Sequence, residues 1–264
     1  MKSFKTHSVL FATFICLYLF SACSEEEEAT PDPVEDTPQL ALANDSNLGS
    51  YLVNQDGRAL YFFSRDVNGS SACEDGCLNA WPVYYQADFE IGSGLSQSDF
   101  GTITRADGEK QTTFKGWPLY YYSGDNGANE INGEGIGKEW FVAKPDYTLM
   151  VATQVVEGLD TGGSMISYLV DAQGNSLYYF LNDQDNESVC TDGCLQAWPT
   201  FSEVADIILP STLNKGAFAV IDRTDGIQQL TYAGRPIYFF AQDAERGETK
   251  GATVPNWTIS ALPL

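Results

Sequence analysis

Short apolar or alternating segments separated by Gly- and Asp-rich turns dominate the chain from residue 48 onward. The first strands this pattern predicts are 51–55, 58–64, 102–106, 110–114 and 117–123. Asp-Gly turns separate the first two strands and the third from the fourth, which is typical of antiparallel hairpins, and the last three strands form a predicted meander. No segment sustains a helical period, so only short helical turns are expected, at 77–81 and near residue 213. The pattern predicts an all-β, antiparallel fold.

The body of the chain is a tandem duplication. The pattern Cys-x-x-x-Cys-x-x-x-Trp-Pro begins at Cys73 and again at Cys190, 117 residues later, and Trp257 follows Trp140 by the same distance. An Arg-x-Asp-Gly turn begins at Arg105 and recurs at Arg223. The duplication predicts two halves, residues 48–156 and 157–264.

Each half contains a shorter internal repeat, marked by the motif Tyr-x-aromatic-x-x-Asp. Its four copies run from Tyr61 to Asp66, Tyr120 to Asp125, Tyr178 to Asp183 and Tyr238 to Asp243. A period of about 60 residues nested in the longer one predicts four related hairpin or meander units, which pack on one another because one unit alone cannot bury its aromatic face.

The N-terminal segment is typical of export. Lys2 and Lys5 precede an apolar run at 9–20 that is too short to span a bilayer, so we expect residues 1–22 to be a cleaved signal peptide. The residues Phe20-Ser21-Ala22-Cys23 resemble the lipobox of bacterial lipoproteins, which implies lipidation of Cys23, although Leu19 lies one position earlier than usual. A plain secretory signal is the alternative.

Four glutamates and a Pro-containing acidic stretch follow Cys23, so residues 23–47 are expected to be an extended tether. Ser24 followed by acidic residues is similar to the tag that sends some lipoproteins to the outer face of the outer membrane. The predicted location is therefore the outer membrane, lipid-anchored and facing the cell exterior. A spacer that only adds solubility is the alternative.

Charge narrows the range of partners. The chain has 14 Lys and Arg against 36 Asp and Glu, a formal net charge of -22. This balance excludes nucleic acid, because binding its phosphates requires clustered cations. The expected partners are the membrane, through the lipid, and a cationic or protein partner at the cell surface.

The repeated motifs resemble those of one known family. Four Tyr-x-aromatic-x-x-Asp copies, two Cys-x-x-x-Cys-x-x-x-Trp-Pro segments and two Arg-x-Asp-Gly turns are similar to the secreted repeat of unknown function, a family of predicted bacterial lipoproteins. The resemblance covers residues 48–264. It implies no established activity, cofactor or catalytic residue.

The four cysteines of the body are expected to form disulfides, as in other exported proteins. One helical turn brings the Cα atoms of Cys73 and Cys77 close enough for a local bridge, and the same holds for Cys190 and Cys194. Trp81 and Trp198 follow on the same face and are expected to cover the bridges. A redox-active dithiol and pairing between the halves are the alternatives.

The four motif aspartates each close a strand and open a polar loop, which favours hydrogen bonds from nearby backbone N–H groups. An ion pair with Arg105 or Arg223 is a second structural role. If the carboxylates converged, they would suit Ca²⁺, the one cofactor that this sequence leaves open, and another candidate cluster is Asp183, Asp185 and Glu187.

Aromatic side chains make up 13% of the chain and invite a sugar-binding interpretation. Most of them fall in apolar strands, which favours packing in the core. Trp117, beside a Lys-Gly turn, is the one expected to be exposed.

The only histidine, His7, lies in the predicted signal. The mature chain therefore lacks the imidazole needed for Ser-His-Asp or Cys-His catalysis and for His-ligated metals. These observations predict a non-catalytic binding or assembly module. The alternatives are a carboxylate-based Ca²⁺ or cation binder and a carboxylate-pair hydrolase acting on glycans.

Overall fold

A computed structural model describes residues 38–202 and 205–263. The predicted signal peptide, Cys23 and the acidic run after it lie outside the described residues. All the described residues belong to a single unit of mutually contacting chain.

Within residues 38–202 and 205–263, fourteen short strands alternate with turns and brief helical segments. The strands are β1 Leu40–Asp45, β2 Gly49–Asn54, β3 Tyr61–Phe63, β4 Phe100–Thr104, β5 Lys110–Phe114, β6 Trp117–Pro118, β7 Trp140–Val142, β8 Leu149–Gln154, β9 Ile166–Asp171, β10 Tyr178–Phe180, β11 Phe218–Asp222, β12 Gln228–Tyr232, β13 Arg235–Pro236 and β14 Trp257–Ile259. The helical segments are α1 Cys77–Ala80, α2 Gly193–Ala197, η1 Ser64–Asp66, η2 Gln97–Asp99, η3 Ile136–Lys138, η4 Lys215–Ala217 and η5 Lys250–Thr253.

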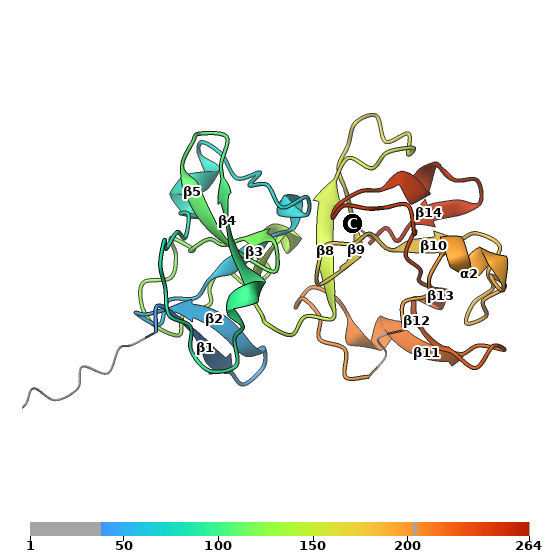
Figure 1. The fold of residues 1–264 in the computed structure, drawn as a ribbon, viewed down its shortest axis with the longest axis horizontal. Coiled ribbons are helices and arrows are strands. Elements are labelled where there is room, and N and C mark those ends of the chain that lie inside the picture. Colours follow the sequence, from blue (N-terminus) through green and yellow to red (C-terminus); the bar gives the residue numbers. More distant parts are fainter. Residues whose placement is uncertain (1–37, 203–204, 264) are drawn as a thin grey trace, which may run out of the picture. The chain divides into compact units, whose positions relative to one another are not determined.

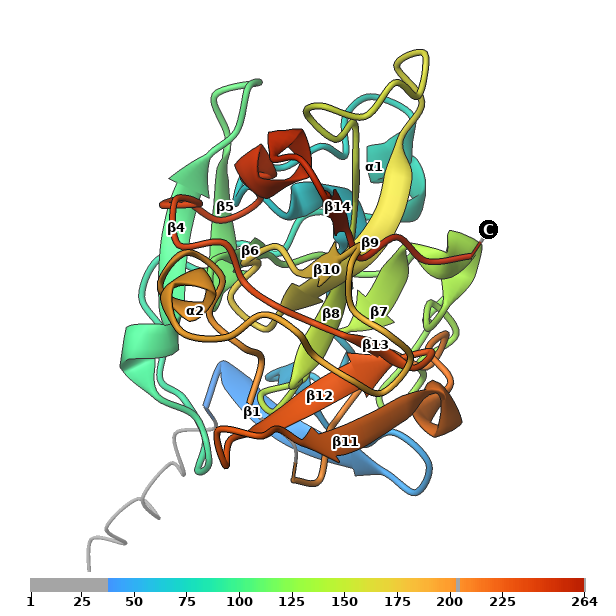
Figure 2. The ribbon, with the colours of Figure 1, turned by 90° about the vertical axis from the view of Figure 1, so that its right-hand side faces the viewer.

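One set of antiparallel sheets occurs twice (Figure 1). The first set comprises β1 with β2, β3 with β7, and the three-stranded meander β4-β5-β6. The second comprises β8 with β9, β10 with β14, and the meander β11-β12-β13, whose first two strands form the lower hairpin in Figure 2. The predicted all-β, duplicated fold is confirmed.

The hairpin turns lie where the Asp-Gly pairs predicted them. Gly57 and Gly108 have φ of 75° and 88°, a backbone region that glycine enters without a steric cost. Strand β5 has the predicted bounds, whereas β6 is only two residues long. The segment after β6 leaves the meander because Tyr120 forms bridges with Tyr61 and Val83 instead.

Two boundaries differ from those expected of the sequence. Strand β1 lies inside the segment predicted to be tether, where the buried Leu40 and the Ala-Leu alternation after it provide a face that pairs with β2. Strand β8 precedes the boundary drawn after residue 156, yet it pairs along its length with β9 of the second half. Since β8 occupies the place that β1 has in the first half, strand pairing puts the start of the second half before Leu149.

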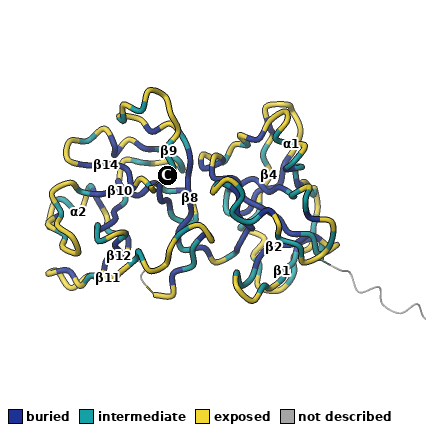
Figure 3. Tube along the Cα trace, turned by 180° about the vertical axis from the view of Figure 1, so that it is seen from behind, coloured by how far each residue is buried: buried dark blue, intermediate teal, exposed yellow. Residues whose placement is uncertain are grey.

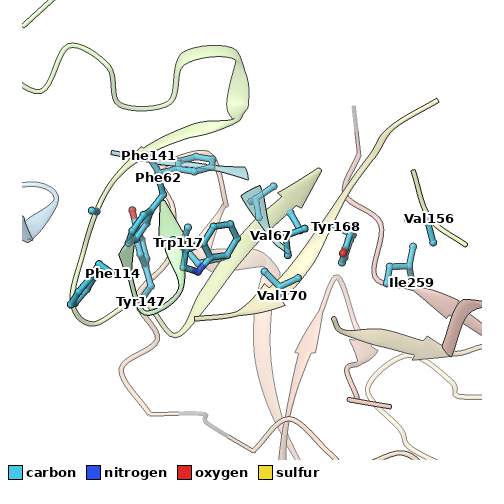
Figure 4. Close-up of a cluster of buried hydrophobic side chains, with 14 of the residues drawn as sticks. Phe62, Val67, Phe114, Trp117, Phe141, Tyr147, Val156, Tyr168, Val170 and Ile259 are labelled. Atoms are coloured by element: carbon cyan, nitrogen blue, oxygen red, sulfur yellow. The ribbon is translucent and has the colours of Figure 1, made fainter. Parts of the chain in front are cut away.

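Buried residues concentrate in strands such as β2, β3, β7 and β8, whereas the connecting loops are largely exposed (Figure 3). The largest cluster joins side chains of both halves. Trp117, which we expected to be exposed, is fully buried in it, near Phe62, Phe114 and Val67 (Figure 4). The exposure prediction was wrong because residues from the second half cover this indole, whose Nε1 donates a 2.9 Å hydrogen bond to the Ala172 carbonyl.

Candidate functional site

The motif tyrosines pair with each other within each half. The backbones of Tyr61 and Tyr120 exchange two hydrogen bonds, of 2.8 and 3.1 Å, across an antiparallel bridge. Those of Tyr178 and Tyr238 do the same, at 2.8 and 3.0 Å. Each bridge places two copies of the motif back to back.

The motif aspartates also connect the two copies, because each accepts a hydrogen bond from the tyrosine of the other copy. In the first half, the Tyr61 hydroxyl donates to Asp125 at 2.6 Å, and the Tyr120 hydroxyl donates to Asp66 at 2.6 Å. Each tyrosine thus binds the aspartate of the other motif copy. The backbone bridge and the crossed side-chain pairs hold the two repeats together as one unit.

The second half repeats this arrangement. There the Tyr178 hydroxyl donates to Asp243 at 2.5 Å, and the Tyr238 hydroxyl donates to Asp183 at 2.7 Å. The four aspartates therefore form separate pairs with tyrosines and do not converge.

The second oxygen of each motif carboxylate accepts a backbone N–H six or seven residues further along the chain. The donors are Ala72 to Asp66 at 2.7 Å, Asn132 to Asp125 at 2.8 Å, Val189 to Asp183 at 2.8 Å and Lys250 to Asp243 at 3.1 Å. The predicted backbone-capping role is present, over a longer loop than an Asx-turn. Both oxygens of every motif carboxylate are thereby hydrogen-bonded.

The arginines of the Arg-x-Asp-Gly turns do not form ion pairs with the motif aspartates. Arg105 pairs instead with Asp107 of its own turn at 3.2 Å, and Arg223 pairs with Asp225 at 2.9 Å. The predicted ion pair between these arginines and the motif aspartates is wrong, because each guanidinium pairs with the aspartate of its own turn.

Each guanidinium instead connects the cysteine loop to the motif. Arg105 donates to the Cys73 carbonyl at 2.9 Å, to Gln111 at 3.0 Å and to the Ser71 hydroxyl, which lies 2.7 Å from the Tyr120 hydroxyl. In the second half, Arg223 donates in the same way to the Cys190 carbonyl, Gln229 and Ser188. A buried chain of hydrogen bonds thus runs from the disulfide loop to Asp66, and its copy runs to Asp183.

The predicted local disulfides are present, Cys73 with Cys77 and Cys190 with Cys194, each with Cα atoms 5.4 Å apart. Trp81, which packs in the same cluster as the first bridge, also stacks on Trp140 with centroids 3.8 Å apart and planes 2° from parallel. Trp198 stacks on Trp257 in the same manner, at 3.6 Å and 3°. The recurrence of Trp140 as Trp257 was visible in the sequence, but their partners were not.

Burial shifts the acidities within these networks. Asp66 is fully buried, and this desolvation raises its pKa to about 7 despite hydrogen bonds from Tyr120 and Ala72 that favour the carboxylate. Burial also raises the pKa of Asp183 and Asp243. The pKa of each motif tyrosine is raised by burial and by its carboxylate partner, so these phenols remain hydrogen-bond donors.

Among the described residues, no group of three or more Asp, Glu, Cys or His side chains is placed to hold a metal ion. Of the suggested cluster, Asp185 and Glu187 are exposed, while Asp183 is bound to Tyr238. The arrangement that would suit Ca²⁺ is therefore not formed by these side chains.

Comparison with known proteins identifies the four units. The family described as "secreted repeat of unknown function" matches residues 43–84, 101–144, 167–202 and 219–259, which is more than half of the chain. The chain belongs to this family of secreted repeats. Each matched segment of this secreted-repeat protein contains one Tyr-x-aromatic-x-x-Asp copy. No curated protein and no solved structure matches it significantly.

Membership implies export to the cell surface or beyond. Within the part of this secreted-repeat protein that the structure describes, no helix is long and apolar enough to cross a membrane.

Four polar residues of these networks were not predicted from the sequence. They are Ser71, Gln111, Ser188 and Gln229, of which both glutamines are fully buried. Their recurrence at equivalent places in both halves was the available signal. A polar residue retained at both copies of a β-strand position points to a repeated hydrogen bond.

Proposed function

We propose that this protein is a non-catalytic binding or assembly module, held by a lipid on Cys23 at the outer surface of the outer membrane. One observation carries the non-catalytic part of the proposal. The motif carboxylates are committed at both oxygens to a tyrosine hydroxyl and a backbone N–H. Such groups stabilise the repeat, and each oxygen that a general base or a nucleophile would use already accepts a hydrogen bond within it.

Further features support a binding role. The networks recur with the same partners in both halves, as expected for a scaffold, since a catalytic site needs to form only once. The acidic surface, with its formal net charge of -22, favours cationic partners in the space outside the membrane. Binding to such a partner should weaken as salt screens the charges.

Membrane attachment is tested in the intact cell. In Cys23→Ala, the lipid acceptor is lost, so the protein should move from the membrane fraction to the soluble fraction. Cys16→Ala is the matched control, because Cys16 lies in the apolar run of the signal and should leave fractionation unchanged. External protease should digest the anchored protein in unbroken cells. Retention of Cys23→Ala in the membrane would contradict the anchor.

The absence of catalysis is tested on the mature chain. Incubation with a panel of glycans and esters should yield no product. The contradictory result is turnover that disappears in Asp125→Asn or Asp243→Asn while the circular dichroism spectrum of the variant stays native. That outcome would assign the carboxylates a chemical role that their hydrogen bonds do not suggest.

A further inference from the structure

A lysine lacking any ionic partner is buried at the end of the first half. Lys144 is only 6% exposed, and among the described residues no carboxylate lies within ion-pair distance of its Nζ and no oxygen accepts a hydrogen bond from it. Its Nζ lies 5.3 Å from the centroid of the Tyr147 ring, which is a cation–π contact. The ammonium itself still reaches solvent, so a ligand could supply the partner that the described residues do not.

Lys144 lines a cavity of about 480 Å³ between its own segment, the 46–49 turn and the 207–215 segment. This volume falls in the range of small-molecule sites. Lys215 also lines the cavity, and its apolar wall includes Leu48, Ile208 and Leu213. Two lysines and an apolar wall therefore line one cavity in a protein whose acidic residues outnumber its basic ones by 36 to 14.

The repeat itself does not require these lysines. By the spacing of 117 residues between Trp140 and Trp257, the position equivalent to Lys144 is Ala261. The residues just before these two accept equivalent backbone hydrogen bonds, Ala143 from Leu52 and Ser260 from Leu169. The segment η4 follows the pattern of η2 in the first half, where Gln97 takes the place of Lys215. Both lysines are additions to the repeated scaffold, and both line this cavity.

The surrounding charges limit the kind of anion that fits. Carboxylates of Asp45, Glu134 and Asp146 act on Lys144 electrostatically and oppose the lowering of its pKa by burial. Asp146 also lines the cavity. A doubly charged headgroup would meet more repulsion from these three groups than a single carboxylate would.

We propose that this cavity binds a monoanionic amphiphile, a carboxylate on a medium-length alkyl chain, with the carboxylate paired to Lys144 and Lys215 and the chain against the Leu and Ile wall. The bound carboxylate supplies the partner that Lys144 lacks. This assignment deepens the proposed binding role and does not depend on the lipid at Cys23.

Calorimetric titration of the mature chain with decanoate, below its micelle-forming concentration, tests the assignment. We expect saturable binding at one site. Lys144→Met keeps the length and removes the charge, and should weaken binding by about tenfold or more, as for loss of a buried charged hydrogen bond. Lys215→Met should weaken it by about two- to fivefold, because this lysine is exposed.

Lys110→Met is the matched control, since Lys110 is exposed on β5 and remote in sequence from the cavity. It makes the same change in net charge and should leave the affinity unchanged. Decanol lacks the charge and acetate lacks the chain, so both should bind much more weakly than decanoate. Equal affinity of decanoate for Lys144→Met and wild type, equal binding of decanol, or tighter binding of decyl phosphate would each overturn the assignment.

Amine labelling gives a readout on the unaltered chain, in case Lys144→Met does not fold. Saturating decanoate should slow reductive methylation of Lys144, followed by peptide mass spectrometry, and leave Lys110 unaffected. Unchanged labelling of Lys144 would overturn the assignment. Such a failure would leave the fractionation of Cys23→Ala and the turnover assays to decide the proposed function separately.

Discussion

The first motif copy of each half, Tyr61 to Asp66 in one and Tyr178 to Asp183 in the other, is covered by different surroundings. Asp66 and the neighbouring Val67 are fully buried, whereas Asp183 is only partly buried and the following Gln184 is exposed. Ser64 is buried against Thr153 of β8, but its equivalent, Leu181, is 52% exposed. The same motif thus packs against protein in the first half and is open to solvent in the second.

The cover over the first copy comes from the second half. Arg246 reaches across to donate to the Val67 carbonyl at 2.6 Å and to the Lys115 carbonyl at 3.1 Å, and its guanidinium lies 4.8 Å from the Trp117 ring. In the first half, the equivalent loop carries Ala128, which packs on its own Gly57. Arg246, a long side chain in one copy of this loop, therefore joins the halves beside Val67, the neighbour of the buried Asp66.

The largest difference between the halves is expected on removing the carboxylates. Asp66→Ala removes a fully buried carboxylate that accepts hydrogen bonds from the Tyr120 hydroxyl and the Ala72 N–H and leaves a gap in its place, so the free energy of unfolding should fall by about 3 kcal/mol. Asp183→Ala, partly open to water, should cost about 1 kcal/mol. Urea unfolding followed by tryptophan fluorescence measures both. Equal losses would show that burial does not distinguish the two copies.

Removing either disulfide should lower the stability by the same amount, because the two loops that they close are equally short. Replacing Cys73 and Cys77 together by Ala should lower the free energy of unfolding by about 2 kcal/mol, and so should replacing Cys190 and Cys194. Thermal unfolding of the two double variants provides the measurement. A much larger loss in one half would mean that its bridge supports contacts beyond its own loop.

Arg246→Met tests the junction itself. Loss of two hydrogen bonds from a charged donor is partly offset because its Nη2 is buried without a partner, so we expect a loss of about 1 to 2 kcal/mol in the free energy of unfolding. Hydrogen exchange at residues 67–72 should quicken, and that at 184–189 should not change. Arg235→Met, within the second half, is the control. Unchanged exchange at 67–72 would contradict the covering role of Arg246.

A dependence of stability on pH is also expected. Because the pKa of Asp66 is raised from 3.8 to about 7, the folded protein holds a proton that the unfolded chain releases between these values. This contribution to stability is fully present below pH 3.8 and is lost as the pH rises through about 7. Asp66→Asn should therefore flatten the fall in melting temperature over this range, and Asp183→Asn should flatten it less. Parallel curves for wild type and Asp66→Asn would exclude the shift.

The sequence by itself determined the strands, the turns and the duplication. Alternating residues and Asp-Gly pairs such as Asp107-Gly108 act over a few neighbours, so their structural meaning is local and survives any arrangement of the repeats. The local disulfides followed for the same reason, because Cys73 and Cys77 lie within one turn. The fourfold motif also showed that the units are related.

Only the tertiary structure decided which groups meet across the repeats. The crossed pairs of Tyr61 with Asp125 and Tyr120 with Asp66, the burial of Trp117 and the cavity at Lys144 all join segments far apart in the chain. A motif read alone gives each carboxylate several equally good partners. The choice among them depends on which surfaces pack, because burial sets both the cost of an unpaired polar group and the partner within its reach.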